Sequence, residues 1–238
     1  MNLWVGTSGF QYPEWKGAFY PEKMPASKML PFYAEHFATT EVNYTFRRIP
    51  AEKTVVAWSD VTPEQFRFAF KAPQRVTHFA KLRDCAEVLR IFHNAIAVAG
   101  QKLGPVLFQL PPSFTKNVDV LRAFLADLPA GMRAAFEFRH NSWFDEVVFE
   151  TLRAANAALC IAENEELATP AVATADFGYL RLRREDYTQA QVEDWTKWIR
   201  EQAAQWSGAF VYFKHEERCV GPGFAKQMQA AWESLAAR

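Results

Sequence analysis

The chain has 238 residues, of which 50% are hydrophobic and 23% are charged, and this composition predicts a globular protein with one large core. Basic residues (Lys plus Arg) and acidic residues (Asp plus Glu) both number 27, so no net charge draws the molecule toward nucleic acid or an anionic membrane. No segment has the apolar length of a signal peptide or a bilayer span. We therefore expect a cytoplasmic protein in which any preference for anions is local.

The three cysteines, Cys85, Cys160 and Cys219, are widely spaced and form neither a C-x-x-C pair nor a cluster with histidines. This pattern fits a reducing compartment and predicts neither a disulfide framework nor a structural zinc site. Cys85 and Cys160 lie among apolar residues, so we expect both to be core thiols.

Short β-rich runs alternate with amphipathic helical patterns along nearly the whole chain, which is typical of a parallel sheet covered by helices. The expected strands are 3–5, 40–43, 66–71, 106–110, 134–139, 159–163, 179–183 and 210–214. These eight units predict an α/β fold, a single (β/α)8 TIM barrel that occupies residues 1–238. No linker or low-complexity tract marks a domain boundary within it.

Helices are expected after most of the strands. Apolar residues recur at i, i+3, i+4 and i+7 from Leu30, from Cys85 and from Leu121. Residues 164–176 contain Pro170 and no helical period, so the sixth βα unit is expected to be degenerate, a loop or a turn.

Local signals also mark where three helices begin. Pro50 precedes the second helix, and Asn117 is placed to cap the fourth. Thr188 and Gln191 form a T-x-x-Q capping box before the seventh helix.

Side-chain alternation sorts the polar residues of each strand, because one face packs under the helices and the other points into the barrel and its mouth. In the run 134–139, Phe136 and Phe138 suit the helix side, which directs Glu137 and Arg139 inward. His215 competes with Lys214 for the inward position, since the last strand is apolar on both faces. The full inward set is Glu41, Asn43, Lys71, Gln109, Glu137, Arg139, Glu163, Arg181, Arg183 and Lys214.

This set combines five cationic and three acidic side chains at one end of a neutral protein. Charges held partly away from water need partners or a ligand. The excess of positive charge favours a site for a small phosphate or carboxylate group, with Arg139, Arg181 and Arg183 as a bidentate clamp. A salt-bridge network that only closes the top of the barrel is the alternative interpretation.

The loop after the first strand offers further ligand contacts. Gly6, Thr7, Ser8 and Gly9 can present backbone N–H groups to an oxyanion, although they lack the spacing of a P-loop and also fit a simple tight turn. Tyr12 and Trp15 follow in a loop bounded by prolines. There they either stack on a planar ligand or pack the loop itself.

Three residues are candidates for proton transfer. Glu137, with Glu41 nearby, is a carboxylate whose pKa neighbouring charges can set, although a structural ion pair with Arg139 is the alternative. His78 and His140 lie just beyond strands, and histidine titrates near neutral pH. His140 instead fits a cap on the next helix, so the candidate catalytic residues are Glu137, Glu41 and His78.

A carboxylate-rich metal site can be drawn from Glu41, Glu137, Glu163 and His215. However, cationic side chains crowd the same space, and no pair of histidines has the spacing of zinc ligands. We therefore expect neither a metal nor a cofactor.

Five segments carry a resemblance to a known family: GTSGFQYPEWKGAFYP at 6–21, EVNYTFRRIP at 41–50, FKAPQRVTH at 70–78, LGPVLFQLPPSF at 103–114 and FEFRHNSWF at 136–144. They resemble the DUF72 family of YecE-like proteins, and this resemblance covers nearly the whole chain and implies a TIM barrel of no established activity. Two strand ends depart from the family pattern. YLRLRRE at 179–185 matches Arg181 but lacks the usual histidine, and YFKHEE at 212–217 replaces an Asn-rich sequence.

The sequence favours a hydrolase, lyase or isomerase that acts on a small phosphorylated or carboxylated substrate by acid/base chemistry at the C-terminal barrel mouth. The expected partner is therefore a small anionic ligand and not a membrane. A nucleic-acid-binding or metal-dependent nuclease module is the alternative, which neutral net charge disfavours because duplex binding usually requires a basic stripe. A non-catalytic anion-binding domain predicts the same site without turnover, so the sequence leaves open whether the protein is an enzyme.

Overall fold

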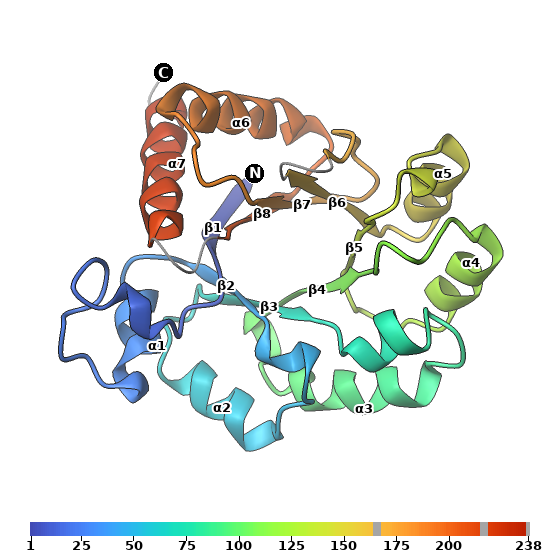
Figure 1. The fold of residues 1–238 in the computed structure, drawn as a ribbon, viewed down its shortest axis with the longest axis horizontal. Helices are drawn as coiled ribbons and strands as arrows, with labels where there is room; N and C mark the ends of the chain where they lie inside the picture. Colours follow the sequence, from blue (N-terminus) through green and yellow to red (C-terminus); the bar gives the residue numbers. More distant parts are fainter. Residues whose placement is uncertain (164–167, 215–218, 237–238) are drawn as a thin grey trace.

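The computed structural model describes residues 1–163, 168–214 and 219–236, and its strands form a closed parallel barrel (Figure 1). The strands follow one another around the barrel in chain order, and β8 pairs with β1 to close it. Their bounds are β1 Asn2–Ser8, β2 Thr39–Val42, β3 Arg67–Lys71, β4 Leu103–Gln109, β5 Ala134–Glu137, β6 Ala158–Glu163, β7 Phe177–Leu182 and β8 Gly208–Phe213. The expected (β/α)8 barrel is confirmed.

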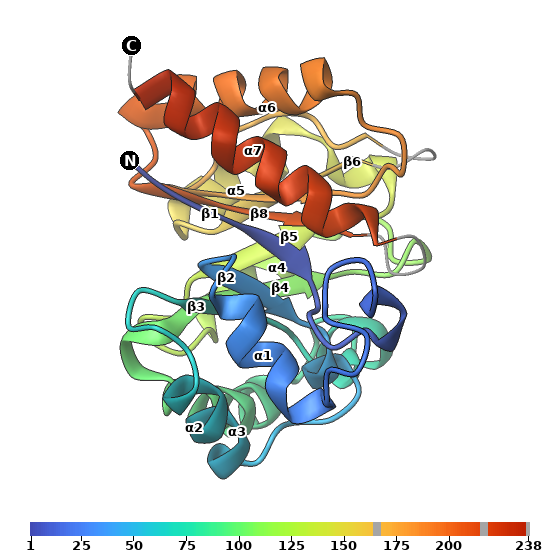
Figure 2. The same cartoon turned by 90° about the vertical axis from the view of Figure 1, so that its left-hand side faces the viewer.

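The α-helices form a ring outside the strands (Figure 1), and α7 packs over β1 and β8 (Figure 2). Their bounds are α1 Ala26–Ala34, α2 Glu52–Asp60, α3 Ala86–Ala97, α4 Val118–Ala126, α5 Glu146–Ala154, α6 Gln189–Glu201 and α7 Val220–Ala236. Short 3-10 helices lie at η1 Pro13–Trp15, η2 Tyr44–Phe46, η4 Gly100–Lys102, η5 Asn141–Trp143 and η6 Gln202–Ala204, and η3 Arg75–Phe79 is a π-helix. None of the helices described is long and apolar enough to traverse a bilayer.

The helix starts expected from the sequence are confirmed. The Asn117 side chain accepts a hydrogen bond from the Val120 N–H at 3.0 Å and caps α4. Thr188 and Gln191 form both hydrogen bonds of a capping box at the start of α6. Pro50 lies two residues before α2, where its fixed φ suits the entry to a helix.

The sixth βα unit is degenerate in the part that the structure describes. Residues 168–176 contain no helix, and β7 follows directly. Thr174 ties this connection back to β6, because its hydroxyl accepts from the Leu159 N–H at 2.7 Å and donates to the Ala157 carbonyl at 2.8 Å.

Two apolar layers support the barrel, one between strands and helices and one inside the barrel. At the amino-terminal end of the strands, Trp4 stacks on Phe210 with ring centroids 4.6 Å apart, and these rings plug the interior. The rest of the interior cluster is Ala69, Leu107, Ala135, Ala158, Cys160, Ala162, Phe177, Tyr179 and Tyr212. A polar site can therefore lie only above this plug, at the carboxyl ends of the strands.

The expectation of core thiols is confirmed for Cys85 and Cys160, which are both buried and free. Burial raises the pKa of the Cys85 thiol to about 11, and it also raises the pKa of Cys160 well above its usual value. Both thiols are therefore protonated near neutral pH and are poor nucleophiles.

Candidate functional site

The polar side chains at the carboxyl ends of the strands converge on the barrel mouth. The inward orientation expected from alternation is confirmed for Glu41, Gln109, Glu137 and Arg181, because they hydrogen-bond with one another inside the barrel. Register explains part of this contact, since Gln109 on β4 lies beside Glu137 on β5.

Arg181, on β7, lies between the carboxylates of Glu41 on β2 and Glu137 on β5. Its NH1 atom donates to Glu137 Oε2 at 2.5 Å, and its NH2 atom donates to Glu41 Oε1 at 3.0 Å. Its side chain is 1% exposed. Buried ions are stable only when they are paired and hydrogen-bonded, so these three side chains form one structural unit.

Glu41, on β2, is the more enclosed of the two carboxylates. It accepts hydrogen bonds from the Ser8 hydroxyl and, at 2.7 Å, from the Tyr179 hydroxyl, in addition to Arg181. Burial alone would raise the pKa of this carboxyl, but the Arg181 charge and the two hydroxyl donors lower it below its usual value. Glu41 is therefore ionised at neutral pH.

Glu137 shares its two oxygens among three donors. Oε1 accepts from Gln109 Nε2 at 2.8 Å and from Arg139 Nε at 3.0 Å, while Oε2 accepts from Arg181. Burial opposes ionisation, but the charges of Arg181 and Arg139 lower the pKa of Glu137 far below its usual range. A carboxylate this weakly basic holds a proton poorly near neutral pH.

Lys71 ends β3 and reaches the same mouth. Its Nζ atom donates to Gln109 Oε1 at 2.8 Å and lies 4.3 Å from the ring centroid of Phe46. Burial, together with the positive charge of Arg181, lowers the pKa of Lys71 to about 7. Its amine is therefore present in both charged and neutral forms near neutral pH.

The two candidate histidines differ in what they contact. The His78 ring meets the Phe46 ring edge-on at 5.0 Å, and burial with the charges of Lys71 and Arg139 lowers the pKa of His78. His140 accepts from the Ser142 N–H at 3.2 Å and caps η5. Of the two interpretations of His140, the cap is the one that the structure bears out.

Three further cationic side chains surround Lys71 and Glu137. Arg139 is held by Glu137 and its side chain is 30% exposed. The charges of Arg139 and Arg183 both act on Glu137, and that of Lys214 acts on Lys71. Arg139, Arg183 and Lys214 each lie just past the carboxyl end of a strand (β5, β7 and β8), whereas His215 lies outside the described residues.

The turn after β1 places Ser8 and Gly9 at the edge of the site. The Ser8 hydroxyl donates to Glu41 and accepts from Asn43 Nδ2 at 2.9 Å, which also confirms the inward orientation of Asn43. Gly9 has φ +96, and a Cβ there would lie 2.3 Å from the Tyr12 hydroxyl oxygen. The tight-turn interpretation of this segment therefore holds, and its anion-binding role stays a prediction.

The aromatic residues after this turn mostly pack the loop. Trp15 is 1% exposed and lies against Tyr12, Phe19 and Tyr20, as the packing alternative expects. Tyr12 is only partly buried, and its hydroxyl donates to the Ser8 carbonyl at 2.6 Å. Tyr12 is thus nearer than Trp15 to any ligand in the mouth.

The inward orientation expected for Glu163 is wrong. Its neighbour Ala162 belongs to the barrel interior, and Glu163 accepts from Tyr187 at 2.7 Å and from Trp195 of α6 at 3.1 Å. β6 is apolar on both faces, so alternation alone could not decide which face is inside. The metal site that included Glu163 is not assembled, and the described residues contain no cluster of three metal-ligating side chains.

Two contacts of the site were not anticipated from the sequence. Tyr179 donates a hydrogen bond to Glu41. Because Tyr179 is two residues before Arg181 on the same strand, alternation could have indicated that it also points inward. The Phe46 ring, in η2, lies against the Lys71 amine. A helix of three residues is too short to show a periodic pattern, so no sequence pattern indicated this contact.

The closed parallel barrel, with its buried ion cluster at the carboxyl ends of the strands, defines a TIM-barrel protein. The chain belongs to the DUF72 family, described as proteins of unknown function, whose sequence pattern it matches over residues 4–237. The resemblance found in the sequence is thereby confirmed.

Similar proteins extend this assignment. The chain is 25% identical to the UPF0759 protein YunF of Bacillus subtilis (strain 168), over 95% of this chain and 93% of YunF. It is 29% identical to the UPF0759 protein YecE of Escherichia coli (strain K12) over 143 residues, and this match spans 60% of this chain but only 50% of YecE. These names state a family and no reaction.

Solved structures show the same fold. A DUF72 family protein from Thermotoga maritima MSB8 superimposes with a TM-score of 0.86 at 26% identity, covering 98% of this chain and 100% of the other. A DUF72 family protein from Enterococcus faecalis V583 gives a TM-score of 0.81 at 18% identity, over 97% of this chain and 95% of the other. A shared fold does not determine the chemistry, which depends on the residues of the site.

Proposed function

We propose that the barrel mouth binds a small phosphorylated or carboxylated substrate and transfers a proton to or from it. The observation that carries this proposal is the imbalance of charge among the described strand ends. Arg181 engages both inward carboxylates, while Arg139 and the Lys71 amine bring further positive charge to the same place. An anionic group of a substrate would complete this arrangement.

Arg139 is the best-placed anion ligand. It is anchored to Glu137 through Nε, and its terminal nitrogens make no hydrogen bond within the described residues. A guanidinium group held in this way can offer its two terminal nitrogens to a phosphate or carboxylate. Both terminal nitrogens of Arg181 donate to carboxylates, so we assign it to positioning.

Lys71 is the proton-transfer residue of this proposal. Its amine lies in the mouth beside Gln109, and a pKa of about 7 suits a group that must both accept and release a proton near neutral pH. His78 lies next to it across the Phe46 ring. Glu41 and Glu137, the carboxylates expected to be catalytic, serve here to orient Arg181, Arg139 and Gln109.

The corresponding reaction is that of a hydrolase, lyase or isomerase whose rate depends on one proton transfer. Substitution of Lys71 by Met keeps most of the apolar stem and removes the amine. We expect a loss of about 10² to 10⁴-fold in kcat, typical of a lost general acid or base. A screen of phosphorylated sugars and carboxylic acids identifies the substrate for this comparison.

Calorimetric titration with inorganic phosphate tests the binding step directly. Wild-type protein should bind phosphate, Arg139→Gln should bind at least about tenfold more weakly, and Arg122→Gln should bind normally. Arg122 is a suitable control because its side chain is 58% exposed and pairs with Asp119 on the surface of α4. Binding that survives in Arg139→Gln would refute the assignment, and binding without any turnover would identify a non-catalytic anion-binding domain.

A further inference from the structure

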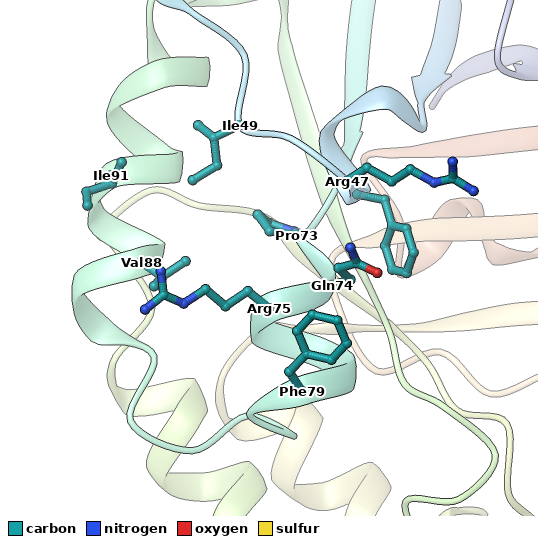
Figure 3. Close-up of a pocket in the computed structure, with 9 residues that line it drawn as sticks. Arg47, Ile49, Pro73, Gln74, Arg75, Phe79, Val88 and Ile91 are labelled. Carbon is teal, nitrogen blue, oxygen red and sulfur yellow. The ribbon is translucent and has the colours of Figure 1, made fainter.

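A pocket of about 290 Å³ lies beside the barrel mouth, between α3 and the segments that follow β2 and β3 (Figure 3). Figure 3 shows Val88 and Ile91 on α3, Ile49 on the facing loop, and Phe79 on the π-helix. These segments connect the carboxyl ends of strands to the next helices. The pocket is therefore at the active end of the barrel.

Phe46 joins this pocket to the mouth. Its side chain lines the pocket, and the same ring contacts the Lys71 amine and the His78 ring. Phe46 therefore borders both the pocket and the place where a ligand would meet the Lys71 amine.

The walls of the pocket keep apolar surface in contact with water. Phe79 is 73% exposed and Ile91 is 45% exposed, and both line the pocket. Exposed apolar side chains that converge on one concave surface are typical of a binding site.

Phe79 lies in a segment whose backbone conformation is unusual. Phe79 ends the π-helix η3, a rare conformation that is frequent at functional sites. Lys81, Leu82 and Asp84, which follow it, all have positive φ without being glycine. The buried side chains of Val76 and Leu82 anchor the segment on either side of Phe79.

The charge at this pocket is also one-sided. Among the residues that the structure describes, its lining includes Arg47 and Arg75 and no acidic side chain. Figure 3 shows the two guanidinium groups extending to opposite sides. Phenylalanine and arginine side chains both interact favourably with aromatic rings.

We infer that this pocket binds the aromatic ring of a substrate whose phosphate or carboxylate group lies at the barrel mouth. This inference rests on the proposed function and narrows its substrate to an aryl-substituted anion. The segments 41–50 and 70–78, which carry the family resemblance, supply most of the residues that separate or line the two subsites.

Three phosphonates, which resist hydrolysis, separate the two subsites in a calorimetric titration. Methylphosphonate probes the mouth alone, 2-phenylethylphosphonate adds a ring, and 2-cyclohexylethylphosphonate adds a group of similar size without π electrons. We expect the phenylethyl compound to bind about tenfold more tightly than methylphosphonate, with the cyclohexyl compound between them.

Two variants test whether the tighter binding of the phenylethyl compound arises in the pocket. Phe79→Ala and Ile91→Asn should remove most of the preference for the phenylethyl compound and leave methylphosphonate binding unchanged. Val147→Asn is the matched control, because Val147 on α5 is 45% exposed, like Ile91, but is not part of the pocket. It should leave all three affinities unchanged.

The outcomes distinguish this inference from the proposed function. Absence of methylphosphonate binding, with phenylethyl binding that depends on Ile91, would support the pocket and refute the anion site. Equal affinities for methyl and phenylethyl compounds, or no binding of either, would overturn the aryl subsite. Equal affinities for the phenylethyl and cyclohexyl compounds would also overturn the assignment to an aromatic ring.

Discussion

Glu137 pairs with two arginines and is 1% exposed, so its charge matters to the stability of the fold. Glu137→Gln leaves the buried Arg181 with Glu41 as its remaining carboxylate. Removal of one partner from a buried ion pair costs about 3 kcal/mol, and we expect a loss of that size in the free energy of unfolding. Denaturation with urea measures it.

Glu87→Gln is the control for this substitution. Glu87 pairs with Arg90 on the surface of α3, where both side chains are more than 60% exposed. Its loss should change the free energy of unfolding by less than about 0.5 kcal/mol. Equal effects of the two substitutions would show that the buried ion cluster does not stabilise the barrel.

The pKa values of Glu41 and Glu137 are both lowered from 4.5 in the folded protein. The folded state therefore binds their protons more weakly than the unfolded state does. The stability that they contribute is present above pH 4.5 and is lost as the pH falls below it. Glu137→Gln should weaken this dependence, which urea denaturation below pH 5 can measure, and an unchanged slope would contradict the assignment.

The lowered pKa of Lys71 predicts that the free energy of unfolding also depends on pH above neutrality. Its pKa falls from 10.5 to about 7 on folding, so between these values the unfolded state binds the proton more tightly. The free energy of unfolding of the wild type, relative to Lys71→Met, should therefore rise as the pH increases from about 7. A difference between the two proteins that is constant with pH would exclude the lowered pKa.

Residue positions were predicted from the sequence only in part. Alternation placed Glu41, Glu137 and Arg181 correctly, because each strand end has one clearly apolar face. Alternation could not reveal that Arg181 forms ion pairs with both carboxylates, since those pairs depend on distances across the barrel. The support of Lys71 by Phe46 depends equally on tertiary packing.

At the scale of single elements, β6 is the strand whose orientation the sequence left undecided. Glu163 lies under α6 and hydrogen-bonds to Tyr187 and Trp195. We therefore expect Glu163→Gln to leave phosphate affinity unchanged, whereas Arg139→Gln reduces it. Loss of phosphate binding in a folded Glu163→Gln protein would contradict the placement of Glu163 outside the mouth.

The helices were easier to anticipate than the connections between them. Capping by Asn117 and by Thr188 with Gln191 is local, so a few neighbouring residues determine it. The π-helix Arg75–Phe79 has no such local signature, and the burial of Val76 and Leu82 beside it depends on tertiary packing. The connection that shapes the inferred aryl subsite was therefore not predicted.

For the whole molecule, the count of eight βα units was sufficient to predict the closed barrel. Closure follows from the pairing of β1 with β8, and the plug formed by Trp4 and Phe210 confines polar chemistry to the opposite end. The mouth gathers side chains from strands distant in the sequence. Alternation predicted several of its charged residues, among them Glu41, Glu137 and Arg181, but not their hydrogen bonds, and it placed Glu163 there wrongly.

An anion site at the barrel mouth is central to the proposed function, and a crystal structure of the protein soaked in phosphate tests it most directly. We predict a phosphate within hydrogen-bonding distance of the Arg139 guanidinium and close to the Lys71 amine, with the pairing of Arg181 to Glu41 and Glu137 intact. An empty mouth at saturating phosphate, or phosphate bound only at other sites, would contradict the central claim.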